Sequence, residues 1–234
     1  MLYREKVAFF DFCETLVDFQ TADAFCDYVR ERTKKTKMFK IEKNIILLKK
    51  IYLLPILQKL FRKYGSIEKK LKAYELKGFN YSDLDEYAKK YYETRIKPHF
   101  IKELTNELVR LKEEGYTVGI VSGGYGIYLK YFVQDFNLDF LLSSNIKIEN
   151  NICTGFLDGL DCMNERKIQY INKLFPSKPT YSIAFSDSLS DIPLLQYATD
   201  GVVVSRNKHQ NWVDNNKFKE LNNLIEILKD NCKI

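Results

Sequence analysis

Apolar segments typical of buried strands alternate with segments of helical periodicity along most of this chain. Residues 6–12 are apolar on both faces and residues 116–122 predict another buried strand, which is typical of a parallel sheet that is covered on two sides. Residues 180–187 predict a further strand. Residues 201–205 repeat the pattern, and residues 140–155 predict short strands around an Asn-rich turn. The predicted helices cover residues 101–115, 125–136, 164–175 and 191–198. Repeated strand–helix units predict an α/β fold with a parallel sheet, whose ligands bind outside the carboxyl ends of the strands.

The segment after the first strand departs from this alternation. Residues 18–97 are rich in helix formers and lack strand alternation, so we interpret them as a helical insertion. The predicted domains are therefore a Rossmann-like core of residues 1–17 and 98–234 and the insertion of residues 18–97. Within it, residues 44–61 predict two short helices broken by Pro55, each apolar on one side and lysine-bearing on the other. The apolar run there is far shorter than the ~18 residues of a transmembrane helix, so we do not expect the segment to span a bilayer.

Charge is distributed unevenly along the chain. Residues 30–72 contain fifteen Lys or Arg and three Glu, a net charge of +12, which leaves −6 for the remainder of a chain whose total is +6. This basic segment has three interpretations: a solvated surface, a surface that attracts an anionic substrate, or a face that contacts a membrane surface or a partner. We do not expect nucleic acid as a partner, because the basic residues alternate with aliphatic rather than stacking aromatic side chains.

The cysteines and the first residues indicate where the protein acts. The five cysteines are scattered, odd in number and free of any Cys-x-x-Cys spacing, so neither a disulfide framework nor a zinc site is expected. The charged segment 3–6 leads directly into the first strand, without the apolar region of a signal peptide. Both observations predict a reducing, cytoplasmic location. With 45% hydrophobic residues in 234, the chain can bury a full core.

Polar and charged residues follow the predicted strands at their carboxyl ends. Asp11 ends the first strand, Ser122 ends the second and is followed by a Gly-Gly pair, and Asp187 ends the third, with Asp191 four residues further on. Lys167 opens the helix before that third strand. Carboxylates bind hard cations, while a hydroxyl, a lysine and backbone N–H groups neutralise phosphoryl oxygens. These residues predict a magnesium-dependent site for phosphoryl chemistry.

The same residues carry a family resemblance. The segments "DFCETL", "IVSGG" and "SDSLSD", together with Lys167, resemble the four motifs of the haloacid dehalogenase superfamily, in order and on the expected elements. The closest resemblance is to its phosphoserine-phosphatase-type branch, in which a helical cap occupies the place of the insertion. The resemblance covers residues 6–17 and the chain from residue 98 to the last strand–helix units.

Carried over position by position, the resemblance assigns a role to each residue. Asp11 resembles the nucleophile that forms an aspartyl-phosphate, and Thr15 resembles the threonine of the first motif. Ser122 resembles the phosphate-binding hydroxyl, and Lys167 the lysine that balances charge. For Mg²⁺, the resemblance implies Asp187 as a direct ligand, Asp191 as a support for the metal or its water, and further contacts from Asp11 and the backbone carbonyl of Cys13. It implies Thr15, Gly123 and Gly124 as substrate-contacting positions.

Each residue, taken alone, also has a purely structural explanation. An aspartate after a strand commonly caps a helix or forms a turn, and Ser-Gly-Gly commonly forms a tight turn. Asp187 and Asp191 alone would cap the helix of residues 191–198, and Lys167 would be one exposed lysine among many. Four such features at successive strand ends, in one consistent order, favour the functional interpretation.

Cys13 departs from the family pattern, which places an aspartate two residues after the nucleophile. In the family this aspartate protonates the leaving group and then activates the hydrolytic water. A thiol has a reference pKa near ~8.5 against ~3.9 for aspartate, so losing acid–base assistance would cost on the order of 10²–10⁴ in rate. A small buried filler is the structural explanation for Cys13. A cysteine nucleophile is disfavoured, because neither histidine has a visible partner in the sequence.

Three functional explanations for Cys13 stay open. In the first, the leaving group of the substrate needs little protonation, as in an acyl phosphate or a diphosphate. Alternatively, Glu14 or Asp18 delivers the proton. In the third, dephosphorylation is slow, and the protein transfers phosphate to another acceptor or is mainly a binding protein.

The expected function is that of a Mg²⁺-dependent phosphomonoester hydrolase, which forms an aspartyl-phosphate and acts on a small phosphorylated metabolite. Asp18, Gln20 and Thr21 follow the first motif and are candidates for contact with the non-phosphate part of the substrate. The alternative is a catalytically weakened domain, with Cys13 in place of the acid–base aspartate, that acts as a phosphotransferase or as a binding or membrane-surface module.

Overall fold

The computed structural model describes residues 5–33, 65–205, 211–216 and 218–221. The two short helices predicted for residues 44–61, and most of the basic segment, lie outside the described residues. Most of residues 218–230, which close the chain, also lie outside them. Among the residues that are described, no helix is both long enough and apolar enough to cross a membrane.

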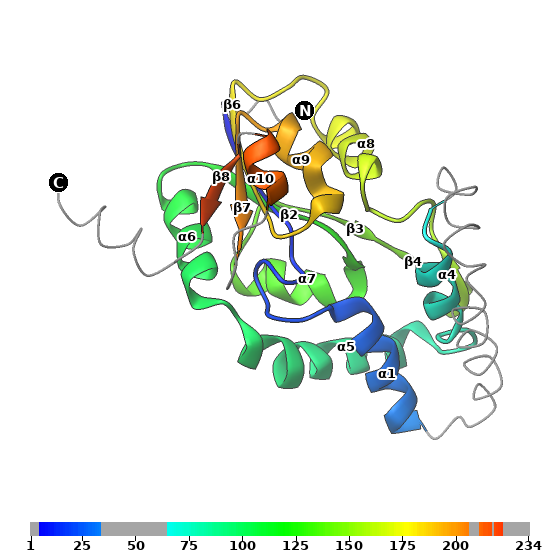
Figure 1. The fold of residues 1–234 in the computed structure, drawn as a ribbon. Helices are drawn as coiled ribbons and strands as arrows, with labels where there is room; N and C mark the ends of the chain where they lie inside the picture. Colours follow the sequence, from blue (N-terminus) through cyan, green and yellow to red (C-terminus); the bar gives the residue numbers. More distant parts are fainter. Residues whose placement is uncertain (1–4, 34–64, 206–210, 217, 222–234) are drawn as a thin grey trace.

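A six-stranded parallel sheet forms the centre of the fold (Figure 1). Its order is β3-β2-β1-β6-β7-β8, and every neighbouring pair is parallel. The strands are β1 (Lys6–Phe10), β2 (Thr117–Tyr125), β3 (Phe140–Ser144), β6 (Tyr181–Ser186), β7 (Asp200–Val204) and β8 (Lys219–Leu221). The prediction of an α/β fold built on a parallel sheet is confirmed. The short edge strand β8 was not predicted.

Helices cover both faces of the sheet, and β1 shows why. Its residues Ala8 and Phe10 pack in one hydrophobic cluster, while Val7 and Phe9 pack in a second on the opposite face. The first cluster includes residues of α6 (Lys102–Glu113) and α7 (Gly126–Asp135). The second includes residues of α8 (Glu165–Leu174), α9 (Ile192–Tyr197) and α10 (Asn211–Asn216). A strand buried on both faces therefore has a continuous apolar sequence.

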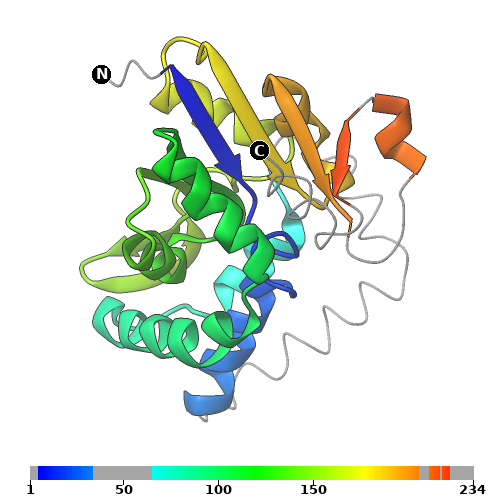
Figure 2. The same ribbon diagram turned by 90° about the vertical axis from the view of Figure 1, so that its left-hand side faces the viewer.

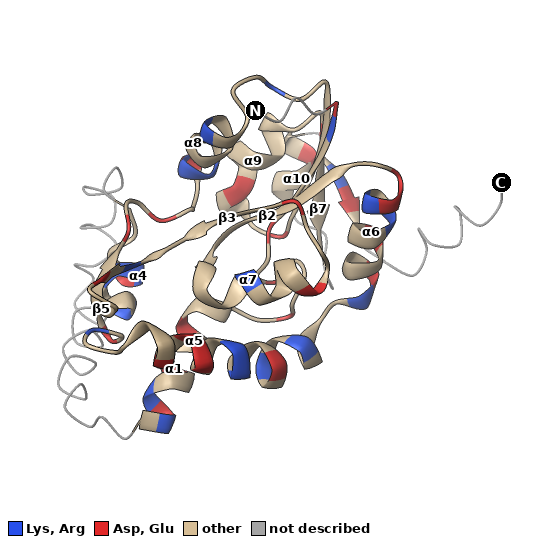
Figure 3. Ribbon diagram, turned by 180° about the vertical axis from the view of Figure 1, so that it is seen from behind, with Lys and Arg blue, Asp and Glu red and all other residues tan. Residues whose placement is uncertain are grey.

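The described part of residues 18–97 is helical and lies beyond the carboxyl ends of the strands (Figure 2). It contains α1 (Thr21–Thr33), α4 (Ile67–Tyr74), α5 (Tyr81–Tyr91), a π-helical turn (Tyr92–Ile96) and a 3₁₀ turn (Lys97–His99). Acidic and basic residues share the exposed face of α5 (Figure 3), where Lys90 and Glu86 form an ion pair one turn apart. The division into a core and an insertion at residues 17 and 98 stays a prediction.

A separate hairpin joins the insertion to the core. Strands β4 (Ile146–Glu149) and β5 (Ile152–Leu157) pair antiparallel, and Asn150 and Asn151 between them have φ of 49° and 62°. Positive φ at both turn residues suits a tight hairpin, which explains the Asn-rich sequence. The N–H of Gly78 donates to the carbonyl of Cys153 at 2.8 Å, and the N–H of Cys153 donates to the carbonyl of Phe79 at 2.8 Å. The insertion therefore pairs with the hairpin edge through its backbone.

The Gly-Gly pair after Ser122 differs from the prediction of a tight turn. Strand β2 continues through Gly123 and Gly124 to Tyr125, and its register against β3 shifts between Ser122 and Tyr125. Close packing explains the glycines: a Cβ on Gly123 would lie 2.8 Å from the Met163 Cγ. The pair is an irregular strand segment pressed against neighbouring side chains.

Candidate active site

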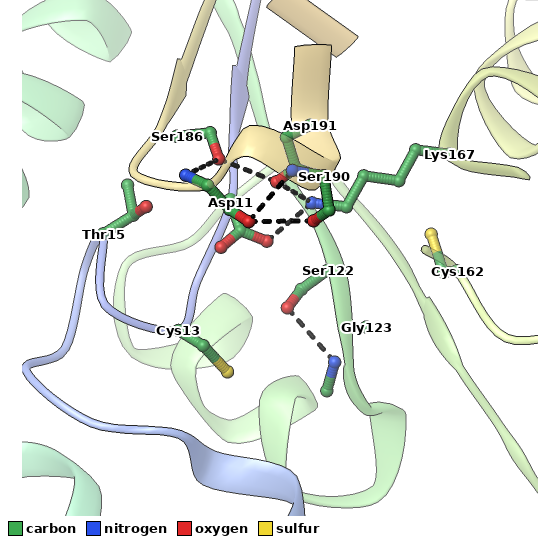
Figure 4. A network of polar contacts seen from close by, with 12 residues as sticks. Asp11, Cys13, Thr15, Ser122, Gly123, Cys162, Lys167, Ser186, Ser190 and Asp191 are labelled. Carbon is green, nitrogen blue, oxygen red and sulfur yellow. Dashed lines mark hydrogen bonds and ion pairs between the residues drawn. The ribbon is translucent and has the colours of Figure 1, made fainter. Parts of the chain in front are cut away.

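One cavity of about 150 Å³ collects most of the predicted site residues. Its lining contains Asp11, Cys13, Gln20, Ser122, Gly123, Gly124, Lys167, Asp187 and Asp191, together with Ala22, Lys69, Met163, Ser188 and Ser190. These residues come from the carboxyl ends of β1, β2 and β6 and the segments that follow them, from the start of α8, and from α4 (Figure 4). Two larger cavities, of about 290 and 310 Å³, lie elsewhere and contain none of the predicted residues. Convergent polar groups, rather than volume, identify the candidate site.

Lys167 lies between two carboxylates. Its Nζ donates to Asp11 Oδ1 at 2.7 Å and to Asp191 Oδ2 at 2.6 Å, and all three side chains are buried. The Ser186 hydroxyl also donates to Asp191 Oδ2, at 2.7 Å. Figure 4 shows the second oxygen of Asp11 pointing away from Lys167. Asp11 therefore has one oxygen held by the lysine and one directed elsewhere.

The carboxyl groups of Asp11 and Asp187 have raised pKa values. Burial raises the pKa of Asp11 to about 7; Lys167 lowers it only in part, and the charges of Asp191 and Asp187 raise it further. Burial and the charge of Glu14 raise the pKa of Asp187 to about 6. Burial lowers the pKa of Lys167, but the charges of Asp11 and Asp191 outweigh it, so that pKa is raised.

This donor set fits a divalent cation. Three carboxylates, those of Asp11, Asp187 and Asp191, lie in the cavity with Lys167, which pairs with two of them. These four groups, fully ionised, carry a net charge of −2, and Lys69 is the second lysine of the lining. Hard oxygen ligands of this kind suit Mg²⁺, and a cation among them would lower the pKa values that burial raises. Among the described residues, no group of three or more His, Cys, Asp or Glu has the geometry of a preformed metal site.

Thr15 is a partner of Asp187 rather than part of the cavity lining. The Thr15 hydroxyl donates to Asp187 Oδ1 at 3.2 Å and accepts from the Asp187 N–H at 3.1 Å. Two hydrogen bonds to one residue fix both the backbone and the carboxylate of Asp187. Thr15 was predicted to contact substrate, and the structure places it behind the carboxylate instead.

The Ser122 hydroxyl accepts from the Gly124 N–H at 3.2 Å, so this N–H already has a partner within the protein. Lys69, from α4, donates to the Gly123 carbonyl. A positive charge from the insertion thus lies beside the Ser122–Gly124 segment. In the sequence, Lys69 is one residue of a basic segment, and nothing local distinguishes it from the neighbouring lysines.

Asp18 and Gln20 have different surroundings. Gln20 lines the cavity and donates to Glu14 Oε2 at 2.5 Å. The Oδ1 of Asp18 lies 2.8 Å from the Nδ1 of His99, and about half of the Asp18 side chain is exposed. Asp18 therefore does not line the cavity, while Met163 and Ser190, which do, gave no signal in the sequence.

Cys13 is half-buried and lines the cavity together with Asp11. Burial raises the pKa of its thiol, and the charge of Asp11 raises it further, while hydrogen bonds from Thr21 act in the opposite direction. A thiol with a raised pKa is a poor replacement for a carboxylate base. Cys26, Cys153 and Cys162 are free and buried as well.

The sequence profile of haloacid dehalogenase-like hydrolases matches residues 8–196, which is most of the chain. The chain belongs to this family. Among curated relatives, it is 29% identical over 110 residues to a phosphoserine phosphatase of Lactococcus lactis, covering 44% of this chain and 50% of the relative. It is 31% identical over 113 residues to a phosphoserine phosphatase of Archaeoglobus fulgidus, covering 47% and 32%. The matched parts thus span half or less of these relatives.

Solved structures share the fold over nearly the whole chain. A protein of unknown function from Bordetella pertussis matches with a TM-score of 0.77 at 14% identity, covering 94% of this chain and 99% of that one. A substrate-bound phosphoserine phosphatase matches with a TM-score of 0.60 at 18% identity, covering 98% and 99%. At these identities the likeness concerns the fold.

Proposed function

We propose that this haloacid dehalogenase-like hydrolase is a metal-dependent phosphomonoesterase that forms an aspartyl-phosphate on Asp11. One observation carries the proposal: Asp11, Ser122, Lys167, Asp187 and Asp191 line the same cavity, although they are distant in sequence. A nucleophile, a cation site and phosphate-neutralising groups are thereby within reach of one small substrate.

In the first step, an oxygen of Asp11 attacks the phosphorus and the bond from phosphorus to the substrate oxygen breaks. Lys167 holds Asp11 by a 2.7 Å hydrogen bond and offsets charge on the phosphoryl group. Ser122 and the backbone of Gly123 orient the phosphoryl oxygens. Mg²⁺, held by Asp11, the Cys13 carbonyl, Asp187 and Asp191, would supply neutralisation of the phosphoryl charge.

In the second step, water attacks the phosphorus of the aspartyl-phosphate and the bond to Asp11 breaks, which restores the carboxylate and releases inorganic phosphate. The family uses an aspartate at the position of Cys13 to assist both proton transfers. Here the side chain at that position is a thiol with a raised pKa. We therefore propose that hydrolysis of the aspartyl-phosphate is the slow step on this chain.

The substrate is proposed to be a small phosphorylated metabolite. A cavity of about 150 Å³ leaves little space beyond a phosphoryl group, and its lining also contains Lys69, Gln20 and Met163. Because two curated relatives are phosphoserine phosphatases, phosphoserine is the first compound to test.

Cys13 also supports a second candidate, a weakened enzyme that passes the phosphoryl group to an acceptor other than water. Slow hydrolysis would lengthen the lifetime of the phospho-enzyme and give such an acceptor time to bind. Accumulation of phospho-Asp11 that an added alcohol or amine discharges would favour this candidate over simple hydrolysis.

Asp11→Asn tests the proposal, because it keeps the shape and removes the nucleophile. The panel contains phosphoserine, sugar phosphates, lipid phosphates, acyl phosphates and p-nitrophenyl phosphate, with phosphate release as the measurement. Asp83→Asn, an exposed aspartate at the start of α5, is the matched control. We expect Asp11→Asn to abolish release and Asp83→Asn to keep it. Undiminished release by Asp11→Asn would refute the mechanism.

A further inference from the structure

A chain of hydrogen bonds ends on the sulfur of Cys13. The Tyr125 N–H donates to the Tyr128 hydroxyl at 3.0 Å, and this hydroxyl lies 2.8 Å from the Thr21 Oγ1. The Thr21 Oγ1 lies 3.1 Å from the Cys13 Sγ, and the Thr21 N–H donates to the same sulfur at 3.5 Å. The chain connects α7 of the core, the start of α1 and the loop after β1.

The direction of these bonds follows from the groups themselves. The Tyr128 hydroxyl accepts from a backbone N–H, which can only donate, so the proton of the hydroxyl needs an acceptor. Tyr128 is fully buried, and its recorded partner is the Thr21 Oγ1. An unpaired buried O–H is costly, so Tyr128 donates to Thr21. Thr21 must then direct its own proton to the Cys13 sulfur.

The sulfur consequently accepts two hydrogen bonds, and its own proton has to point elsewhere. Cys13 lines the cavity, and Figure 4 shows its sulfur on the same side of Asp11 as the Ser122 hydroxyl. We propose that Thr21 and Tyr128 are positioning residues that hold the Cys13 thiol as a hydrogen-bond donor toward the leaving-group oxygen of the substrate. The inference rests on the proposed phosphatase function and deepens it.

The thiol keeps its proton in this role. The ordinary thiol pKa of ~8.5, which burial raises further for Cys13, leaves it protonated at neutral pH, so it donates a hydrogen bond to the oxygen on which negative charge develops. The bond from phosphorus to that oxygen breaks with its electron pair on the oxygen, which then takes a proton from water. The hydrogen bond therefore helps most when the leaving group is a poor one.

Thr21 is held well enough to serve this purpose. It is fully buried, and the Tyr91 hydroxyl donates to its carbonyl at 2.9 Å. Tyr91 and Tyr128 also pack against each other, with ring centroids 5.5 Å apart. Two tyrosines that pack against each other thus hydrogen-bond to the backbone carbonyl and to the hydroxyl of Thr21.

Thr21→Val removes the hydroxyl with little change in shape, and Thr21→Ser keeps it. The measurement is the ratio of kcat/KM on an alkyl phosphate to kcat/KM on p-nitrophenyl phosphate, whose leaving group is a stable anion. We expect Thr21→Val to lower this ratio by roughly tenfold relative to the native protein, and Thr21→Ser to keep most of the native ratio. Tyr128→Phe should lower the ratio in the same direction, because Thr21 loses its donor. Thermal unfolding of each variant establishes that it is folded.

A double-mutant cycle of Thr21→Val with Cys13→Ala distinguishes a role of Thr21 in positioning the thiol from a role in packing. Without the thiol, Thr21→Val should leave the ratio unchanged, whereas a packing role would lower activity on both substrates alike. A ratio that Thr21→Val leaves intact in the native background would overturn the proposal, and so would a ratio that it still lowers in the Cys13→Ala background. If the native protein hydrolyses neither ester, the proposed function itself has failed.

The S–H stretching band of Cys13, isolated as the infrared difference between native protein and Cys13→Ala, gives a test without turnover. A donated hydrogen bond lowers the S–H stretching frequency. We expect added inorganic phosphate to lower the S–H stretching frequency of Cys13 in the native protein. We also expect the substitution Thr21→Val, without phosphate, not to raise this frequency. A rise in Thr21→Val would mean that the thiol donates to Thr21, which contradicts the inferred direction.

Discussion

Magnesium should stabilise this protein strongly at pH 8 and hardly at pH 5. The pKa values of Asp11 and Asp187 are raised to about 7 and about 6, from an ordinary value of 3.8. Without metal, the folded state retains protons that the unfolded chain releases, so stability falls as pH rises from about 4 to about 7. A bound cation requires both carboxylates ionised, so its affinity rises over the same range.

The magnitude follows from the two pKa values. At pH 5 roughly one molecule in 10³ has both carboxylates ionised, whereas at pH 8 most molecules do, so the affinity for Mg²⁺ should differ by roughly 10³-fold. A Mg²⁺ concentration of about 100 times the pH 8 Kd adds about 2.7 kcal/mol to the free energy of unfolding at that pH. The same concentration adds less than about 0.1 kcal/mol at pH 5. For a chain of this size, the difference corresponds to a Tm shift of about 5–10 °C.

The assay is thermal unfolding followed by circular dichroism, at both pH values, with and without Mg²⁺ at matched ionic strength. Asp187→Asn removes one proposed ligand and should lose the shift, while the exposed Asp83→Asn should keep it. A shift of equal size at pH 5 would refute the reasoning, as would a shift that survives in Asp187→Asn.

Three further predictions concern the proton donor, the insertion and the basic segment. Cys13→Asp should raise kcat on alkyl phosphates by roughly 10²–10⁴ and change p-nitrophenyl phosphate hydrolysis far less, and a native protein that outperforms the variant on alkyl phosphates would contradict this. Lys69→Met should raise KM by about tenfold through loss of a cavity cation, while the exposed Lys70→Met on the same helix should not; equal KM values for the two variants would argue against a binding role. If residues 30–72 contact membranes, the protein should co-sediment with phosphatidylserine vesicles at low salt and be released by added salt. No sedimentation at low salt would support the solvated-surface interpretation.

The sequence predicted the parts of this fold whose cause is local. Strands such as β1 are apolar on both faces because both faces are buried, and this pattern is visible without coordinates. Asp11 and Asp187 were identified because each follows such a strand directly, and parallel strands end at one edge of the sheet. The edge strand β8 covers only Lys219–Leu221, too short to give a pattern.

Other features depend on contacts that sequence spacing does not reveal. Lys69 resembles the lysines around it, and only the packing of α4 brings it to Gly123. Thr21 was noted as a residue that follows the first motif, but its bond to Tyr128 joins positions 107 residues apart. The Gly-Gly pair suggested a turn because glycine commonly forms turns, whereas here it permits Met163 and Tyr128 to approach the strand closely.

The order of the strands has a consequence for how the chain is made. Strand β1 is synthesised first yet lies between β2 and β6, which begin at Thr117 and Tyr181. At a translation rate of about 5–20 residues per second, the ribosome needs roughly 5–20 s after β1 to produce β2, and longer to produce β6. Throughout that interval the nascent chain carries an apolar strand with both edges unpaired. Every molecule therefore carries β1 with both edges unpaired before the residues that line the candidate cavity exist together.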